Sequence, residues 1–202
     1  CDALEQKGLH IIASNWMYGA RHTLTTKPVN TVDDLYGLKI RVPTNQIQTQ
    51  GFEVLGATGT GMPLGDVYTA LSTGNIDGAE NPLATLYGRS LQEVAKYLIL
   101  DGHVLNFTTL VCSADWYNSL TPEQQTALTE TCKAAAEYNN GLVKDADGDY
   151  LQKMKDAGVT VVEPSDGVLA GFREKAQAFY DMGSTFGWSD GLYDTVKAAM
   201  GK

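Results

Sequence analysis

Cysteine is scarce in this sequence, and its spacing excludes the common metal and redox sites. The cysteines are Cys1, Cys112 and Cys132, and no pair has the C-x-x-C spacing that zinc ribbons and thioredoxin-like sites require. Cys112 falls in a strand pattern and Cys132 in the helix pattern that follows it. The two could form a disulfide, but two reduced, buried thiols are the favoured interpretation. Whether Cys1 pairs with anything is left open.

Positive charge and long apolar runs are also in short supply. The 15 basic residues are outnumbered by 24 acidic ones, which gives a formal net charge of −9. Nucleic acid is therefore not an expected partner, because proteins that bind it present a basic face. No apolar run approaches the roughly 20 residues of a membrane-spanning helix, so the chain is not expected to span a membrane itself.

Motifs for catalysis or cofactor binding are missing as well. The glycines of residues 56–61 (GATGTG) have the wrong offsets for a dinucleotide fingerprint and follow a helix pattern. Residues 183–187 (GSTFG) lack the central serine of a nucleophile elbow. Residues 145–149 (DADGD) imitate the start of a calcium loop, but Tyr150 stands where the sharp turn needs glycine. No catalytic residue, cofactor or metal site is expected.

The three histidines do not have the spacing of metal ligands. His10, His22 and His103 lie far apart in sequence, with no cysteine or carboxylate cluster beside them. A structural role is the simplest interpretation for each. His22 adjoins Arg21, and its exposure to a binding cleft is left open.

Short strand and helix patterns alternate along the chain, which predicts a mostly parallel sheet with helices on its faces. Residues 15–19 are predicted to be a loop between two strands, and Thr31 is predicted to cap a single turn that ends at Gly37. The predicted strands are residues 9–14, 21–26, 38–42, 103–112 and 159–163, with a short extended segment at 59–63 and a brief strand that starts at 76–77 and leads into 80–82. The predicted helices are residues 45–55, 65–73, 121–157, 165–182 and 189–200.

Arg41 lies at the carboxyl end of the strand predicted over residues 38–42. In open α/β sheets this end faces the ligand crevice. A guanidinium there offers a planar fork of donors that a carboxylate can accept with two parallel hydrogen bonds. Taken alone, Arg41 could equally pair with an acidic side chain of its own protein.

Four segments in this order closely resemble the solute-binding proteins of tripartite ATP-independent periplasmic (TRAP) transporters, the DctP-like family. They are residues 16–21 (WMYGAR), 38–43 (LKIRVP), 62–71 (MPLGDVYTAL) and 77–83 (DGAENPL). The resemblance covers nearly the whole chain and implies an α/β, periplasmic-binding-protein-like two-lobed fold, here lacking much of the N-terminal lobe. A signal sequence is then expected upstream.

The resemblance also implies a division into lobes. Residues 1–18 and 107–146 correspond to the remaining part of lobe I with its hinge crossings. Residues 19–106 and 147–202 correspond to lobe II, which carries the arginine site.

The resemblance assigns roles to five residues. Arg41 matches the arginine that binds the ligand carboxylate. Arg21 matches a second arginine that often contacts the same acid or its other polar end, and Asn81 matches the asparagine that orients the first arginine and touches the ligand. Leu64 stands where several members carry an aromatic residue, which favours smaller or aliphatic acids over ring-stacked ligands. Asn106 lies near the place where the chain crosses between lobes.

The function implied is capture without chemistry, by an extracytoplasmic protein in the periplasm or its equivalent. An organic acid would be bound by hinge closure and delivered to the membrane permease of a TRAP transporter. One alternative is an enzyme or a non-transport ligand-sensing domain on the same two-lobed fold, with Asp77 and Glu80 as acid–base residues in the enzyme. Another is a scaffold domain that binds no small ligand.

Overall fold

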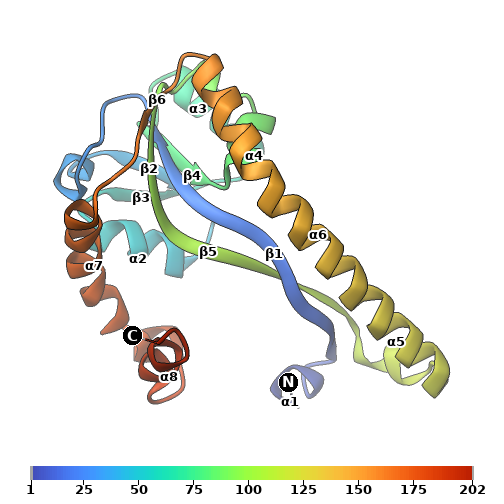
Figure 1. Ribbon diagram of the computed structural model, residues 1–202. Coiled ribbons are helices and arrows are strands. Elements are labelled where there is room, and N and C mark those ends of the chain that lie inside the picture. The colour runs from blue at the N-terminus through green and yellow to red at the C-terminus, as the bar shows by residue number, and fades with distance from the viewer. Residues whose placement is uncertain (1, 202) are drawn as a thin grey trace. The chain divides into compact units, whose positions relative to one another are not determined.

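A computed structural model describes residues 2–201, which divide into two compact units. Unit 1 holds the residues as far as Arg21, then Pro82–Ala84 and Gly102–Lys153. Unit 2 holds His22–Asn81, Thr85–Asp101 and the residues from Met154 onward. Three long elements continue from one unit into the other (Figure 1), namely β1 (Leu9–Thr25), β5 (Tyr97–Ser113) and α6 (Pro122–Asp156).

The strands form one six-stranded sheet in the order β3-β2-β4-β1-β5-β6. The prediction of a mostly parallel sheet is confirmed, because β2 is parallel to both β3 and β4 and β5 is parallel to β6, whereas β1 is antiparallel to β4. The short strands are β2 (Lys39–Val42), β3 (Thr58–Gly61), β4 (Gly78–Asn81) and β6 (Thr160–Val162).

The predicted loop at residues 15–19 is wrong, because β1 runs through it without a break. In unit 1, the side chain of Asn140 accepts from the backbone N–H of Met17 at 2.7 Å and donates to the carbonyl of Asn15 at 2.7 Å. Asn139 donates to the carbonyl of Met17 at 3.0 Å. The side chains of Asn139 and Asn140 therefore satisfy backbone N–H and C=O groups of β1 at the place where the loop was predicted.

The helices of unit 2 begin and end close to the predicted places. Asn45 caps α2 by accepting from the N–H of Gln48, and Ser165 caps α7 by accepting from the N–H of Val168. The elements are η1 (Val32–Leu35), α2 (Gln46–Val54), η2 (Leu64–Asp66), α3 (Val67–Ser72), η3 (Leu91–Glu93), α7 (Asp166–Tyr180), η4 (Gly183–Phe186) and α8 (Leu192–Ala199), while α4 (Leu83–Gly88) begins in unit 1 and ends in unit 2.

The predicted cap at Thr31 is also confirmed. The carboxylate of Asp34 accepts from the backbone N–H groups of Asn30 and Thr31, each at 2.9 Å. These bonds, that from Asn30 foremost, lower the pKa of Asp34.

In unit 1, α1 (Asp2–Glu5) and α5 (Ala114–Asn118) are short, whereas α6 has 35 residues. Thr121 and Gln124 cap the start of α6 reciprocally, as the Thr-Pro-Glu-Gln pattern predicts. Gly158 follows its end with a φ of 77°, a left-handed conformation that favours glycine. None of the helices within residues 2–201 is both long and apolar enough to cross a bilayer.

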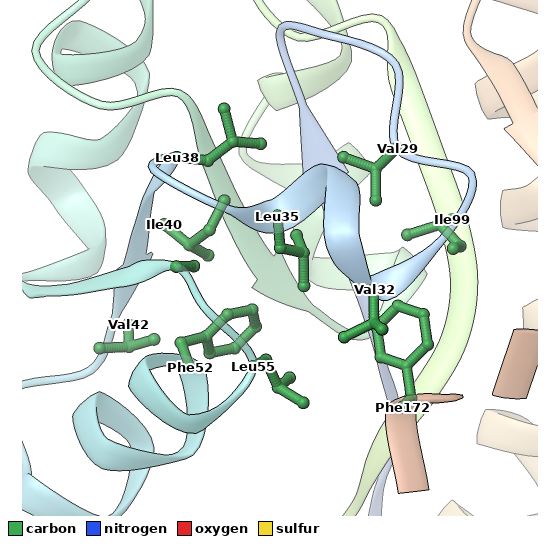
Figure 2. Close-up of a cluster of buried hydrophobic side chains, with 11 residues drawn as sticks. Val29, Val32, Leu35, Leu38, Ile40, Val42, Phe52, Leu55, Ile99 and Phe172 are labelled. Carbon is green, nitrogen blue, oxygen red and sulfur yellow. The ribbon is translucent and has the colours of Figure 1, made fainter. Parts of the chain in front are cut away.

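The main hydrophobic cluster lies in unit 2, where α2, η1 and α7 cover one face of the sheet. Figure 2 shows Ile40 and Val42 of β2 on the side of Phe52 and Leu55, with Phe172 of α7 beside Val32. Because successive side chains of a strand point to opposite faces, this packing directs Arg41, between Ile40 and Val42, to the other face.

The thiols of Cys112 and Cys132 are free, as predicted, but the prediction that they are buried is wrong because both are only half-buried. Cys112 lies in the part of β5 that belongs to unit 1, where many side chains, including those of Leu105 and Phe107, are exposed to solvent. Desolvation, with a smaller contribution from Glu5, raises the pKa of the Cys112 thiol. Cys1 lies outside the described residues.

Candidate functional site

The strand register brings Arg41 and Asn81 to the same face of the sheet in unit 2. Arg41 of β2 pairs with Ala79 of the parallel strand β4, so their side chains point to the same side. Asn81 lies two residues beyond Ala79 and shares that face. Both side chains are buried, with 4% of Arg41 and 3% of Asn81 exposed. A cation and an amide therefore lie together at the carboxyl ends of two parallel strands.

The guanidinium of Arg41 is held by a backbone carbonyl. Its Nε donates to the carbonyl oxygen of Met62 at 2.9 Å, and its Nη2 donates to the same oxygen at 2.6 Å. Met62 comes directly after β3, the neighbour of β2. One oxygen that accepts from two N–H groups fixes the plane of the guanidinium, which is the preorganisation that recognition of a planar carboxylate requires.

Leu64 begins η2 two residues after Met62 and is half-buried. Its aliphatic side chain is thus close in sequence to Met62, the residue whose carbonyl bonds Arg41. Leu64 therefore lies in the same unit as Arg41 and Asn81.

The other two candidate residues belong to unit 1. Arg21, in β1, is buried with 3% exposed, and Asn106, in β5, is half-buried. Of the five candidates, Arg41 and Asn81 are the pair that the register brings together on one face, and Leu64 lies in the same unit.

Asp77 and Glu80 are not arranged as an acid–base pair. Asp77 precedes β4, where its carboxylate accepts from the backbone N–H of Lys39 at 3.0 Å and from Nζ of Lys27 at 3.1 Å. The bond from Lys39 is the main cause of the lowered pKa of Asp77, the contact with Lys27 adds to it, and burial opposes it. Glu80 is 1% exposed and points to the face opposite Arg41.

Two features of this region were missed by the sequence analysis. The carbonyl of Met62 has no side-chain signal, so only the fold reveals its contact with Arg41. The position of His22, whose exposure to a cleft the sequence left open, is directly opposite Asn81 in the antiparallel pairing of β1 with β4, and only the strand register reveals this. Among the described residues no cluster of three or more histidine, cysteine or acidic side chains is placed to hold a metal ion.

Comparison with known proteins agrees with the fold. Residues 1–185 match the family described as bacterial extracellular solute-binding protein, family 7 (DctP). The chain is 35% identical over 165 residues to the 2,3-diketo-L-gulonate-binding periplasmic protein of Escherichia coli, a match that covers 81% of this chain and 50% of that protein. The chain thus spans about half the length of such relatives.

Solved structures give the same result. A TRAP periplasmic solute-binding protein from Ochrobacterium anthropi with bound L-fuconate is 40% identical, with a TM-score of 0.89. One from Actinobacillus succinogenes with bound L-galactonate is 37% identical, also with a TM-score of 0.89. Each match covers 98% of this chain and 64% of the other. The predicted α/β periplasmic-binding fold, present in part, is confirmed, and the chain belongs to bacterial extracellular solute-binding protein family 7, the DctP family.

Proposed function

We propose that this protein is the solute-binding component of a TRAP transporter, working outside the cytoplasm in the periplasm. It captures an organic acid and delivers it to the permease subunits in the membrane. The observation that carries this proposal is the buried guanidinium of Arg41, fixed by the carbonyl of Met62 on the same sheet face as Asn81. A carboxylate fits such a fork with two charge-assisted hydrogen bonds.

The acid proposed is a sugar acid of the aldonate or uronate type. Relatives at 40% and 37% identity hold L-fuconate and L-galactonate, and two others at 32% hold β-D-galacturonate. These ligands share one carboxylate and several hydroxyl groups. Leu64 suits the carbon backbone of such an acid, since it provides an aliphatic contact rather than a ring for stacking.

The proposed mechanism is hinge closure between two lobes. Residues 1–18 and 107–146 contribute to lobe I and residues 19–106 and 147–202 to lobe II, with Arg21 as a second carboxylate contact and Asn106 at a crossing. The ligand favours the closed state only through contacts that the open state lacks. Membership of the DctP family supports binding without turnover, because relatives are named for the solutes they bind. The structural engagement of Asp77 also argues against an acid–base role.

Calorimetry with L-galactonate tests the proposal in the complete natural polypeptide that contains these 202 residues. Arg41→Ala should weaken binding by about a hundredfold or more, because the loss of one partner of a buried ion pair costs about 3–5 kcal/mol. Arg41→Lys should recover only part of the affinity, since an ammonium keeps the charge but not the fork.

Arg173→Ala is the matched control, because Arg173 is exposed on α7 and should leave affinity unchanged. Thermal melting should first establish that each variant is folded. If Arg41→Ala binds L-galactonate within about threefold of the parent, a difference of roughly 0.7 kcal/mol, the assignment of Arg41 to the carboxylate is wrong.

A further inference from the structure

His22 lies on the same face of the sheet as the proposed carboxylate site. Its Cα is paired with that of Asn81 across the antiparallel strands β1 and β4, so the two side chains are direct neighbours. Arg41 reaches the same face through its pairing with Ala79. Three polar side chains from three adjacent strands of unit 2, Arg41, Asn81 and His22, therefore share this face, with Asn81 and His22 level with each other and two residues farther along β4 than the position opposite Arg41.

A buried carboxylate lies beside the imidazole of His22. The side chain of Asp101 is 1% exposed, and its Oδ2 accepts from Oγ1 of Thr23 at 2.7 Å. Its Oδ1 lies 3.8 Å from Nδ1 of His22. At that distance the carboxylate acts on the ring through its charge rather than through a hydrogen bond.

We propose that His22 is a specificity-determining residue that hydrogen-bonds a hydroxyl group of the captured sugar acid, and that Asp101 is its positioning residue. This inference rests on the proposed function, because it assumes that Arg41 holds the carboxylate. An imidazole can bond a hydroxyl group in either charge state, as donor or acceptor. The side chain of His22 is 15% exposed, against 1% for Asp101, so it is the more accessible of the two.

The test uses the complete natural polypeptide with L-galactonate as the probe. His22→Ala should weaken binding about five- to tenfold, the value of one hydrogen bond, and His22→Gln should restore part of it because an amide can still bond a hydroxyl group. Asp101→Asn should weaken binding less, since it retains the acceptor for Thr23. His10→Gln is the control, because His10 contacts Glu5 and stacks on Tyr117 in unit 1.

A second readout separates contact from a general structural effect. In a protein with labelled histidine rings, saturation with L-galactonate should shift the ring resonances of His22 and leave those of His10 unchanged. A structural role alone would give neither this shift nor rescue by glutamine.

The possible failures can be told apart. If His22→Ala binds within about twofold of the parent, or the His22 resonances do not move, while Arg41→Ala still abolishes binding, the inference about His22 is wrong and the proposed function stands. If the parent binds neither L-galactonate nor D-galacturonate, the proposed substrate class is wrong and the inference fails with it.

Discussion

At the scale of single residues, Arg41 shows how the backbone can hold a buried cation. Burial of a charged group is expensive unless it is hydrogen-bonded, and the carbonyl of Met62 meets part of that requirement. A carbonyl is a dipole rather than a full charge, and here its one oxygen orients the guanidinium through two N–H groups.

Asp77 provides a residue-scale prediction about stability and pH. Its pKa is lowered in the folded protein, chiefly by the N–H of Lys39, so its ionised form stabilises the fold. This contribution is fully present above the unfolded pKa of about 3.9 and is lost as the pH falls through the lower folded value. Asp77→Asn should cost about 1 kcal/mol at pH 7, since Lys27 is well exposed and adds little.

Urea denaturation at pH 7, 5, 4 and 3 measures this effect. The difference between parent and variant should shrink toward zero at the acid end, where the parent carboxyl is protonated. Asp190→Asn, at an exposed position, serves as the control. A difference that is equal at pH 7 and pH 3 would contradict the assignment.

At the scale of elements, β1 marks the limit of prediction from sequence. The local patterns identified β2, α2, the Thr31 turn and both ends of α6, because their caps, prolines and glycines are close in sequence. The predicted loop is instead strand, bonded there by Asn140, which is 123 positions from Met17 and gives no local signal. The neighbourhood of Asn81 and His22 depends likewise on strand register, and the Met62 contact on a backbone oxygen.

Removal of the Asn140 side chain should loosen β1. Asn140→Ala leaves the N–H of Met17 and the carbonyl of Asn15 without this partner, so hydrogen exchange over residues 15–17 should accelerate severalfold. Exchange measured by mass spectrometry checks this. Glu137→Ala, at an exposed position on the same helix, should leave the exchange unchanged. Equal exchange in both variants would show that the asparagine does not hold the strand.

Close packing of α2 on β3 gives a second prediction for an element. A Cβ added to Gly59 would lie 2.6 Å from the carbonyl oxygen of Thr49 and 2.8 Å from its Cα, so the helix would have to move. Gly59→Ala should therefore destabilise the protein by about 1–3 kcal/mol. Gly65→Ala is the matched control, because a Cβ there meets nothing within 4 Å, and its effect should stay within about 0.5 kcal/mol. Denaturant midpoints that agree for the two variants would rule out the close contact.

At the scale of the whole molecule, net charge and local charge point to different conclusions. A net charge of −9 repels polyanions, yet it does not prevent capture of a small acid by buried arginines, because the field inside a site is set by the nearest groups. A negative net charge and local binding of a small acid can therefore occur in the same protein. Stability should therefore respond to one class of small anion and not to nucleic acid.

Linkage makes this response measurable without any assumption about how the lobes move. A ligand that binds only the folded protein stabilises it by about 2.7 kcal/mol at one hundred times its Kd. L-Galactonate should therefore raise the Tm of the complete natural polypeptide by several degrees, whereas galactitol should not, since it keeps the hydroxyl groups but lacks the carboxylate. Arg41→Ala should remove the shift even if its Tm without ligand is unchanged. An equal shift with galactitol, or a full shift in Arg41→Ala, would show that the carboxylate is not what Arg41 recognises.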